Sequence, residues 1–217
     1  MGHSLKILGR TSSINVRKVV WTLQHLGLPF VRTDAGMAFG IVDTPAYRAL
    51  NPNGLIPVLL DGDLVVYETA AIAMHLADTH PQAGLMPPLG TPDRAVAYQW
   101  LAWLTNALQA TLLVYYYPER WVAEGNAAAA AEVQARAEAR IGGLLDQLDA
   151  ECARRGGPWF LGGQVSVLPV AALHLLLSRV AELPADGVAS KLVLTVLAVH
   201  LTGRGVARAL RARRVLG

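Results

Sequence analysis

The sequence predicts two consecutive parts, a mixed α/β domain over residues 1–80 and an all-α domain over residues 94–217. Short apolar runs alternate with helical periodicity over the first 80 residues. Residues 81–93 contain four of the twelve prolines and two of the glycines, a composition typical of a linker. After that segment apolar residues recur at helical spacing, so a mixed domain followed by a helical domain is expected.

The first domain is expected to follow the order β-α-β-α-β-β-α. Apolar runs, caps and stop residues set the approximate limits of these elements. The expected elements are a strand at 5–8, a helix at 14–26, a strand at 29–33, a helix from Pro45, a hairpin at 56–68 and a helix at 70–79.

The segment from 51 to 72 carries the most specific signals in the chain. Pro57 stands at the start of an apolar run, although proline removes a donor from a sheet ladder. An Asp-Gly pair at 61–62 then predicts a tight hairpin turn. The second strand stops abruptly at Glu68, and Thr69 is expected to be the hydroxyl N-cap of the next helix.

Three helical segments are expected in the second domain. The first is apolar, runs from 93 to 117 and meets a proline at 118. The second, at 126–156, is rich in alanine and carries charges on its outer face. A loop and a third helix follow between 158 and 183, and more helix is expected as far as residue 214.

Composition excludes several classes of protein. The net charge of +3 comes from residues 167–217, with seven basic against two acidic residues, so no nucleic-acid partner is expected. No apolar run reaches the ~18 residues of a membrane span, so no membrane partner is expected. The single Cys152 provides no disulfide framework, which favours a reduced, cytoplasmic compartment. The six histidines show no metal-binding spacing, so no metal site is expected.

Two stretches, "NPNGLIPVLLDGDLVVYETAAI" at 51–72 and "PWFLGGQVS" at 158–166, resemble glutathione S-transferases. The resemblance covers roughly residues 4–166 and is closest to cytosolic-type bacterial members with a serine-type active site. It implies a thioredoxin-like fold for the first domain. It also implies that residues 1–80 bind glutathione as a co-substrate, and that the helical domain forms a hydrophobic pocket for an electrophile.

The same resemblance implies a binding role for four residues. If the Ile56–Pro57 bond is cis, the backbone of Ile56 turns outward and pairs with the cysteinyl backbone of the bound tripeptide. The helix N-terminus and Thr69 suit the γ-glutamyl carboxylate, and Glu68 suits the ammonium group. The alternative is a capped helix after an edge strand, with no ligand.

The thiol of glutathione needs a group that stabilises its thiolate, and the turn after the first strand offers four polar side chains. Ser13 is the preferred donor, because Ser13, Arg17 and Val19 fit a Ser-x-x-x-Arg-x-Val pattern similar to that of serine-type members. Asn15 would add a side-chain N–H. Ser12 and Thr11 are the alternatives, and either serine could simply cap the helix that starts at residue 14.

The expected electrophile pocket includes Tyr115, Tyr116 and Arg120, late in the first long helix. Core packing is the alternative for the tyrosines, and a solvated side chain is the alternative for Arg120. The family resemblance, together with the apolar, Trp- and Tyr-rich helix, also implies a homodimer with two-fold symmetry.

The tail departs from the family pattern. All fourteen aromatic residues lie before residue 161. Ser166 is followed three residues later by Pro169, which cannot offer the amide that completes a capping box. Two explanations remain open, a divergent helical end or a shifted reading frame near residue 167.

The expected function is therefore that of a glutathione transferase. Such an enzyme conjugates the glutathione thiolate to a hydrophobic electrophile, as in detoxification, or uses it in a related reduction. The alternatives are a non-catalytic protein of the same fold that binds glutathione or apolar ligands, and an interaction module without a ligand.

Overall fold

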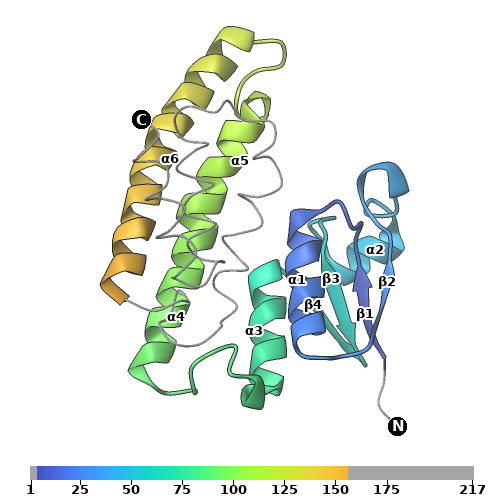
Figure 1. Ribbon diagram of the computed structural model, residues 1–217. Helices are drawn as coiled ribbons and strands as arrows, with labels where there is room; N and C mark the ends of the chain where they lie inside the picture. Colours follow the sequence, from blue (N-terminus) through green and yellow to red (C-terminus); the bar gives the residue numbers. More distant parts are fainter. Residues whose placement is uncertain (1–3, 156–217) are drawn as a thin grey trace, which may run out of the picture. The chain divides into compact units, whose positions relative to one another are not determined.

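The chain divides into two compact units, residues 1–88 and residues 89–217 (Figure 1). A computed structural model describes residues 4–155, so the second unit is described from residue 89 to residue 155. The boundary between the units falls inside the segment 81–93, which the sequence predicts as a linker. No helix in the described part of the chain is long and apolar enough to cross a membrane.

The first unit is a four-stranded mixed sheet with helices on both faces, and its strands and α-helices follow the predicted order β-α-β-α-β-β-α. Its strands lie in the order β2-β1-β3-β4, with β1 parallel to β2 and antiparallel to β3, and β3 antiparallel to β4. The strands are β1 (Leu5–Leu8), β2 (Phe30–Thr33), β3 (Val58–Asp61) and β4 (Leu64–Tyr67). The helices are α1 (Ile14–His25), α2 (Pro45–Leu50) and α3 (Thr69–Thr79), with short 3₁₀ turns η1 (Met37–Phe39) and η2 (Pro81–Ala83).

Alternation along the strands divides the core between the two faces of the sheet, because successive side chains point to opposite faces. On β3, Leu59 joins the core under α1 and α3, whereas Val58 joins the core under α2. The larger core contains the fully buried side chains Ile7, Val16, Val19, Leu23, Leu59, Ile72 and Leu76. Burying an Ile or Leu side chain contributes about 1.5–3 kcal/mol, so this layer fixes both helices against the sheet.

Pro57 lies immediately before β3 and outside its ladder. The β3–β4 pairing runs from Val58 opposite Tyr67 to Asp61 opposite Leu64, so the missing N–H of proline removes no hydrogen bond from it. The Ile56–Pro57 peptide bond is cis, as the resemblance implies. The hairpin turn predicted from Asp61 and Gly62 is present, with Gly62 at a φ of 62°.

The expected N-cap of α3 is wrong by one residue. Thr69 is the first residue of the helix, and Glu68 occupies the N-cap position with a φ of 72° and no capping hydrogen bond from its side chain. The chain leaves β4 through this positive φ, so the helix begins one residue earlier than a Thr69 cap would allow. By contrast, the cap predicted for α2 is confirmed, since the Thr44 hydroxyl accepts from the Tyr47 N–H at 3.3 Å.

The described part of the second unit is helical. It consists of α4 (Pro92–Trp103), a π-helical segment η3 (Leu104–Gln109), α5 (Ala110–Tyr116), the short turn η4 (Pro118–Trp121) and α6 (Ala127–Arg155). The single α-helix expected at 93–117 is therefore interrupted by the π-helical segment. The helix expected between 158 and 183, Ser166 and the rest of the tail lie outside the described residues.

The long helix α6 packs beside α5 through one stripe (Figure 1). The stripe consists of Ala137, Ile141, Leu145 and Leu148, all buried and spaced four, four and three residues apart. A hydrogen bond also joins the two helices, because Nε2 of Gln134 donates to the carbonyl of Tyr115 at 3.1 Å. The alanine-rich and charged outer face predicted for this helix remains exposed.

Candidate active site

The residues of the first unit that have a predicted role lie at one edge of the sheet. Because β1, β2 and β4 run in one direction and β3 runs in the other, the carboxyl ends of the first three lie at the same edge as the start of β3. The turn 9–13, the pair Ile56–Pro57 and the pair Glu68–Thr69 therefore meet at this edge. Such an edge is where ligands of open α/β sheets commonly bind.

Ser13 is buried at this edge, and its hydroxyl makes no hydrogen bond within residues 4–155. Its side chain is 8% exposed, whereas Ser12 is exposed. Its backbone is held on both sides, since its N–H donates to the Arg10 carbonyl at 3.1 Å and its carbonyl accepts from the Arg17 N–H at 3.0 Å. Ser13 occupies the N-cap position of α1 without capping it. The hydroxyl is therefore free to donate to a ligand atom.

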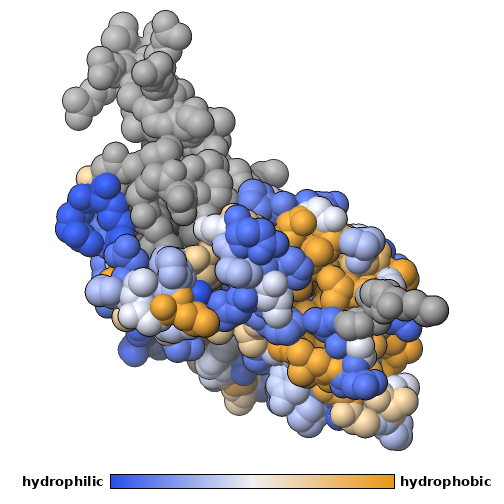
Figure 2. All heavy atoms as spheres, turned by 90° about the horizontal axis from the view of Figure 1, so that it is seen from below, coloured by the Kyte–Doolittle hydropathy of each residue, from blue (hydrophilic) through white to orange (hydrophobic). Residues whose placement is uncertain are grey.

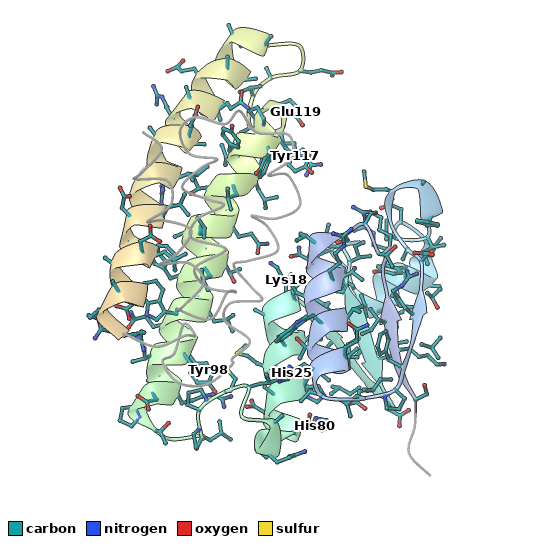
Figure 3. All side chains as sticks on the ribbon, viewed as in Figure 1. Lys18, His25, His80, Tyr98, Tyr117 and Glu119 are labelled. Atoms are coloured by element: carbon teal, nitrogen blue, oxygen red, sulfur yellow. The ribbon has the colours of Figure 1, made fainter. Side chains whose placement is uncertain are left out.

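Asn15 is oriented by a lysine that the sequence did not single out. The Nζ of Lys18 donates to Oδ1 of Asn15 at 3.1 Å. An amide whose oxygen faces an ammonium group presents its NH₂ elsewhere, so Asn15 is set as a donor. Lys18 lies on α1, is 2% exposed, and burial lowers its pKa to about 7 (Figure 3). The i, i+3 spacing from Asn15 is the signal in the sequence that could have found it.

Two arginine side chains, those of Arg17 and Arg32, hold the backbone of this edge through hydrogen bonds. Nε of Arg17 donates to the Thr11 carbonyl at 2.8 Å, which ties the turn to the first turn of α1. Nη1 of Arg32, on β2, donates to the Gly9 carbonyl at 2.8 Å and also contacts Asp34. Arg17, which belongs to the same Ser-x-x-x-Arg-x-Val pattern as Ser13, therefore has a structural role at this edge.

Ile56 offers an unpaired stretch of backbone at the start of β3. Its N–H and carbonyl make no hydrogen bond with any of residues 4–155. The preceding carbonyl, that of Leu55, accepts from the Tyr47 hydroxyl and from Nδ2 of Asn51, each at 2.9 Å. The segment is thus anchored on one side while Ile56 keeps a donor and an acceptor for an extended ligand.

At the junction of β4 and α3, the carboxylate-bearing Glu68 directly precedes backbone amides that come before the first intrahelical hydrogen bond. Glu68 is exposed, and its φ of 72° is strained for a residue with a Cβ, at a cost of about 1–3 kcal/mol. The first intrahelical bond runs from the Ile72 N–H to the Glu68 carbonyl at 2.9 Å, so the amides of residues 69–71 lie before the helical ladder. These amides suit an anion, and the Glu68 carboxylate beside them suits a cation.

The three residues expected in an electrophile pocket lie at the end of α5 and in η4. Tyr115 and Tyr116 are half-buried, with their rings 5.2 Å apart, and burial raises the pKa of Tyr115. The guanidinium of Arg120 lies 4.3 Å from the ring centre of Tyr117. A cavity of about 570 Å³ in this unit is lined by residues between Pro118 and Gln134, and none of the three expected residues is among them.

The fold defines a class of protein, a thioredoxin-like domain followed by helices. Residues 12–79 match the profile of the glutathione S-transferase N-terminal domain. Glutathione S-transferase GstB of Escherichia coli K12 is 36% identical over 176 residues, covering 77% of this chain and 79% of GstB. Glutathione S-transferase 3 of Zea mays is 34% identical over 154 residues, covering 69% and 68% of the two chains.

A solved structure extends the likeness to three dimensions. The theta class glutathione S-transferase of Xanthomonas axonopodis pv. citri, crystallised with glutathione bound, is 30% identical with a TM-score of 0.71. The match covers 95% of this chain and 98% of that one. The chain therefore belongs to the glutathione S-transferase family.

Replacing Lys18 by methionine is expected to change stability in a pH-dependent way. Burial lowers the pKa of Lys18 from 10.5 to about 7 in the folded chain, so the unfolded chain binds the proton more tightly. The native protein therefore gains stability as the pH rises from about 7 towards 10.5, and Lys18→Met does not. In urea unfolding, the free energy of unfolding of Lys18→Met minus that of the native chain should be largest below pH 7 and should decrease above it.

Lys6→Met is the matched control, because Lys6 is an exposed lysine of the same unit. It should leave the pH profile of stability close to that of the native chain. A difference between Lys18→Met and the native chain that is constant with pH would contradict the lowered pKa.

Proposed function

We propose that the chain is a serine-type glutathione transferase, which transfers the glutathione thiolate to a hydrophobic electrophile or uses it in a related reduction. The observation that carries the proposal is the buried hydroxyl of Ser13, which has no hydrogen-bond partner among the described residues and lies at the sheet edge that also presents Ile56 and the start of α3. Membership of the family and the glutathione bound in the Xanthomonas structure support glutathione as the co-substrate.

In the proposed complex, glutathione lies extended along this edge. Its cysteinyl backbone pairs with the N–H and carbonyl of Ile56, at the cis bond to Pro57. Its γ-glutamyl carboxylate accepts from the amides at the start of α3 and from the Thr69 hydroxyl, and its ammonium group binds Glu68. This arrangement uses the unpaired backbone of Ile56 and the uncapped helix end.

The chemical task of the protein is to hold the thiolate. A free thiol has a pKa of about 8.5, and lowering it by about 2 units requires roughly 2.7 kcal/mol of selective stabilisation. A hydrogen bond to a charged group contributes about 1.5–3 kcal/mol, so the Ser13 hydroxyl and the Asn15 amide together have sufficient strength. The nearby Lys18 ammonium adds positive charge while it is protonated.

The reaction itself then needs no covalent enzyme intermediate. The thiol proton leaves to solvent, the sulfur forms a bond to the electrophilic carbon, and the leaving group departs with the bonding electron pair. Serine acts as a donor, because its own pKa is too high for it to remove the proton. Tyr115, Tyr116 and Arg120 are proposed to contact the electrophile, with Arg120 facing any anionic portion of it.

A non-catalytic protein that only binds glutathione is the second candidate. Binding of glutathione without turnover of any electrophile would favour it. Retention on immobilised glutathione tests both candidates against an interaction module without a ligand. Turnover of several aryl halides then separates the enzyme from the binding protein, since absence of turnover with a retained ligand favours the latter.

Ser13→Ala is expected to raise the thiol pKa of bound glutathione and to lower kcat by ~10-fold or more, with glutathione affinity nearly intact. The reason is that the hydroxyl contacts mainly the thiolate, so its loss affects the reactive state more than binding. Thiolate absorbance of the complex against pH gives the first quantity, and steady-state kinetics gives the second. Ser12→Ala is the control, and a larger effect in that variant would move the role to Ser12.

Glu68→Gln and Thr69→Ala are expected to weaken glutathione binding, each by ~1–3 kcal/mol, with little change in the thiol pKa. Both residues lie at the γ-glutamyl end of the proposed complex and not at the sulfur. Glutamine keeps the size of the side chain, which matters because position 68 has a positive φ. Titration calorimetry measures the Kd, with Asp63→Asn on the hairpin turn as control. An unchanged Kd in both variants would contradict the proposal that Glu68 and Thr69 bind the γ-glutamyl group.

The chain is proposed to form a homodimer with two-fold symmetry. Large apolar side chains remain exposed in both units, including Val31 at 53% and Tyr98 at 41%, and Figure 2 shows hydrophobic residues gathered on the displayed face of the first unit. A stable interface buries at least ~1,200 Å². Sedimentation equilibrium should give twice the chain mass at micromolar protein, and a species of 23.2 kDa at every concentration would contradict the dimer.

A further inference from the structure

Two buried side chains converge on the backbone immediately before Ile56. The Tyr47 hydroxyl donates to the Leu55 carbonyl at 2.9 Å, and Nδ2 of Asn51 donates to the same oxygen at 2.9 Å. Tyr47 is 3% exposed and Asn51 is 2% exposed, so both donors belong to the folded interior of the first unit. Both side chains therefore act on one peptide group, the one that joins Leu55 to Ile56.

The Asn51 side chain is itself held in one orientation. Its Oδ1 accepts from the Asn53 N–H at 3.0 Å, which leaves Nδ2 as the group that faces the Leu55 carbonyl. Its backbone is held as well, since the Asn51 N–H donates to the Tyr47 carbonyl at 2.9 Å and the Asn51 carbonyl accepts from the Gly54 N–H at 3.0 Å. This turn therefore delivers a donor, and not an acceptor, to the Leu55 carbonyl.

The peptide group between Leu55 and Ile56 carries this constraint to the ligand-facing side. A trans peptide is planar, and its C=O and N–H point in opposite directions. The bond is trans. A carbonyl held on the side of Tyr47 and Asn51 therefore directs the Ile56 N–H away from them. That N–H makes no hydrogen bond within residues 4–155.

The two donors also make this arrangement difficult to change. Rotation of the peptide plane would break both hydrogen bonds and leave a buried hydroxyl and a buried amide without an acceptor, which costs free energy. Connected hydrogen bonds polarise one another, so a carbonyl that accepts two bonds makes the N–H of the same peptide group a stronger donor. Tyr47 and Asn51 thus set both the direction and the strength of the Ile56 N–H.

We propose that Tyr47 and Asn51 are positioning residues for glutathione, which direct the Ile56 N–H at the cysteinyl carbonyl of the bound peptide. The proposal rests on the proposed function, because it assumes that the cysteinyl backbone pairs with Ile56. Both side chains act through the Leu55–Ile56 peptide group and not by touching the ligand. Their effect is therefore confined to the part of the affinity that comes from one hydrogen bond.

Tyr47→Phe and Asn51→Asp each remove one donor with little change in size. Phenylalanine keeps the ring in the core that also contains Val58. Aspartate keeps an oxygen that accepts from the Asn53 N–H, and loses the donor to Leu55.

Tyr67→Phe and Asn53→Asp are the matched controls. Tyr67 packs against the same core as Tyr47, and its hydroxyl makes no hydrogen bond with any described residue. Asn53 is exposed in the same turn as Asn51, so Asn53→Asp adds the same charge without removing a donor from the Leu55 carbonyl.

The Kd is measured by calorimetry for glutathione and for its (E)-alkene isostere, in which a carbon–carbon double bond replaces the Cys–Gly amide. The isostere keeps the planar trans geometry and lacks the cysteinyl carbonyl oxygen. The native chain is expected to bind glutathione more tightly than the isostere. Tyr47→Phe and Asn51→Asp are each expected to raise the Kd of glutathione about 3- to 10-fold, the size of one hydrogen bond, and to leave that of the isostere unchanged.

Three outcomes contradict the proposal. Equal changes for glutathione and the isostere overturn it, because they show a general loosening of the site. A Kd of glutathione that matches the two controls in both variants also overturns it. A selective effect in one variant alone overturns the role of the other residue.

Measurements on the native chain separate this inference from the proposed function. A native chain that binds neither ligand overturns both, whereas equal binding of glutathione and the isostere overturns the inference alone. If one variant fails to fold, the other tests the same carbonyl. If both fail, the amide proton of Ile56 is followed by NMR in the native chain, where a downfield shift with glutathione but not with the isostere is expected, and no shift overturns the inference.

Discussion

The packing of α1 and α3 on one face of the sheet is the interaction on which the candidate site depends. Both helices follow strands that run in the same direction, so both begin at the same edge of the sheet. The core that includes Val16 on α1 and Ile72 on α3 holds these beginnings in place. Ser13 and Thr69 are distant in sequence, and the shared hydrophobic layer brings the elements that carry them to the same edge of one rigid scaffold.

Much of the first unit could be predicted because its signals are local. The Asp61–Gly62 pair determines the hairpin turn, and Thr44 followed by Pro45 determines the start of α2. The cis bond before Pro57 could not be inferred from composition, since most bonds before proline are trans. It followed from a resemblance in which proline, turn and Glu-Thr occur at fixed spacing.

The details that sequence reasoning missed depend on contacts made only after folding. Thr69 has the right side chain for an N-cap, but the positive φ at Glu68 moves the helix start, and tertiary structure imposes that φ. Lys18 was not singled out from the sequence, yet it is buried and its Nζ donates to Oδ1 of Asn15. Ser13 could be proposed from the sequence because its position, immediately before the first turn of α1, is a local feature of the chain.

The π-helical segment η3 has a consequence for how the second unit can vary. A π-helical turn accommodates an extra residue relative to an α-helix, and each residue of an α-helix turns the chain by about 100°. Deleting one residue between Leu104 and Gln109 would restore α-helical bonding, and because the π-helical turn already absorbs that residue, the later side chains of α5, Tyr115 and Tyr116 included, would keep about the same direction. An extra residue in a regular α-helix would turn all later side chains by about 100°, so the π-helical turn preserves the direction in which each tyrosine points. In this part of the chain the length can therefore differ by one residue without changing which side chains α5 presents.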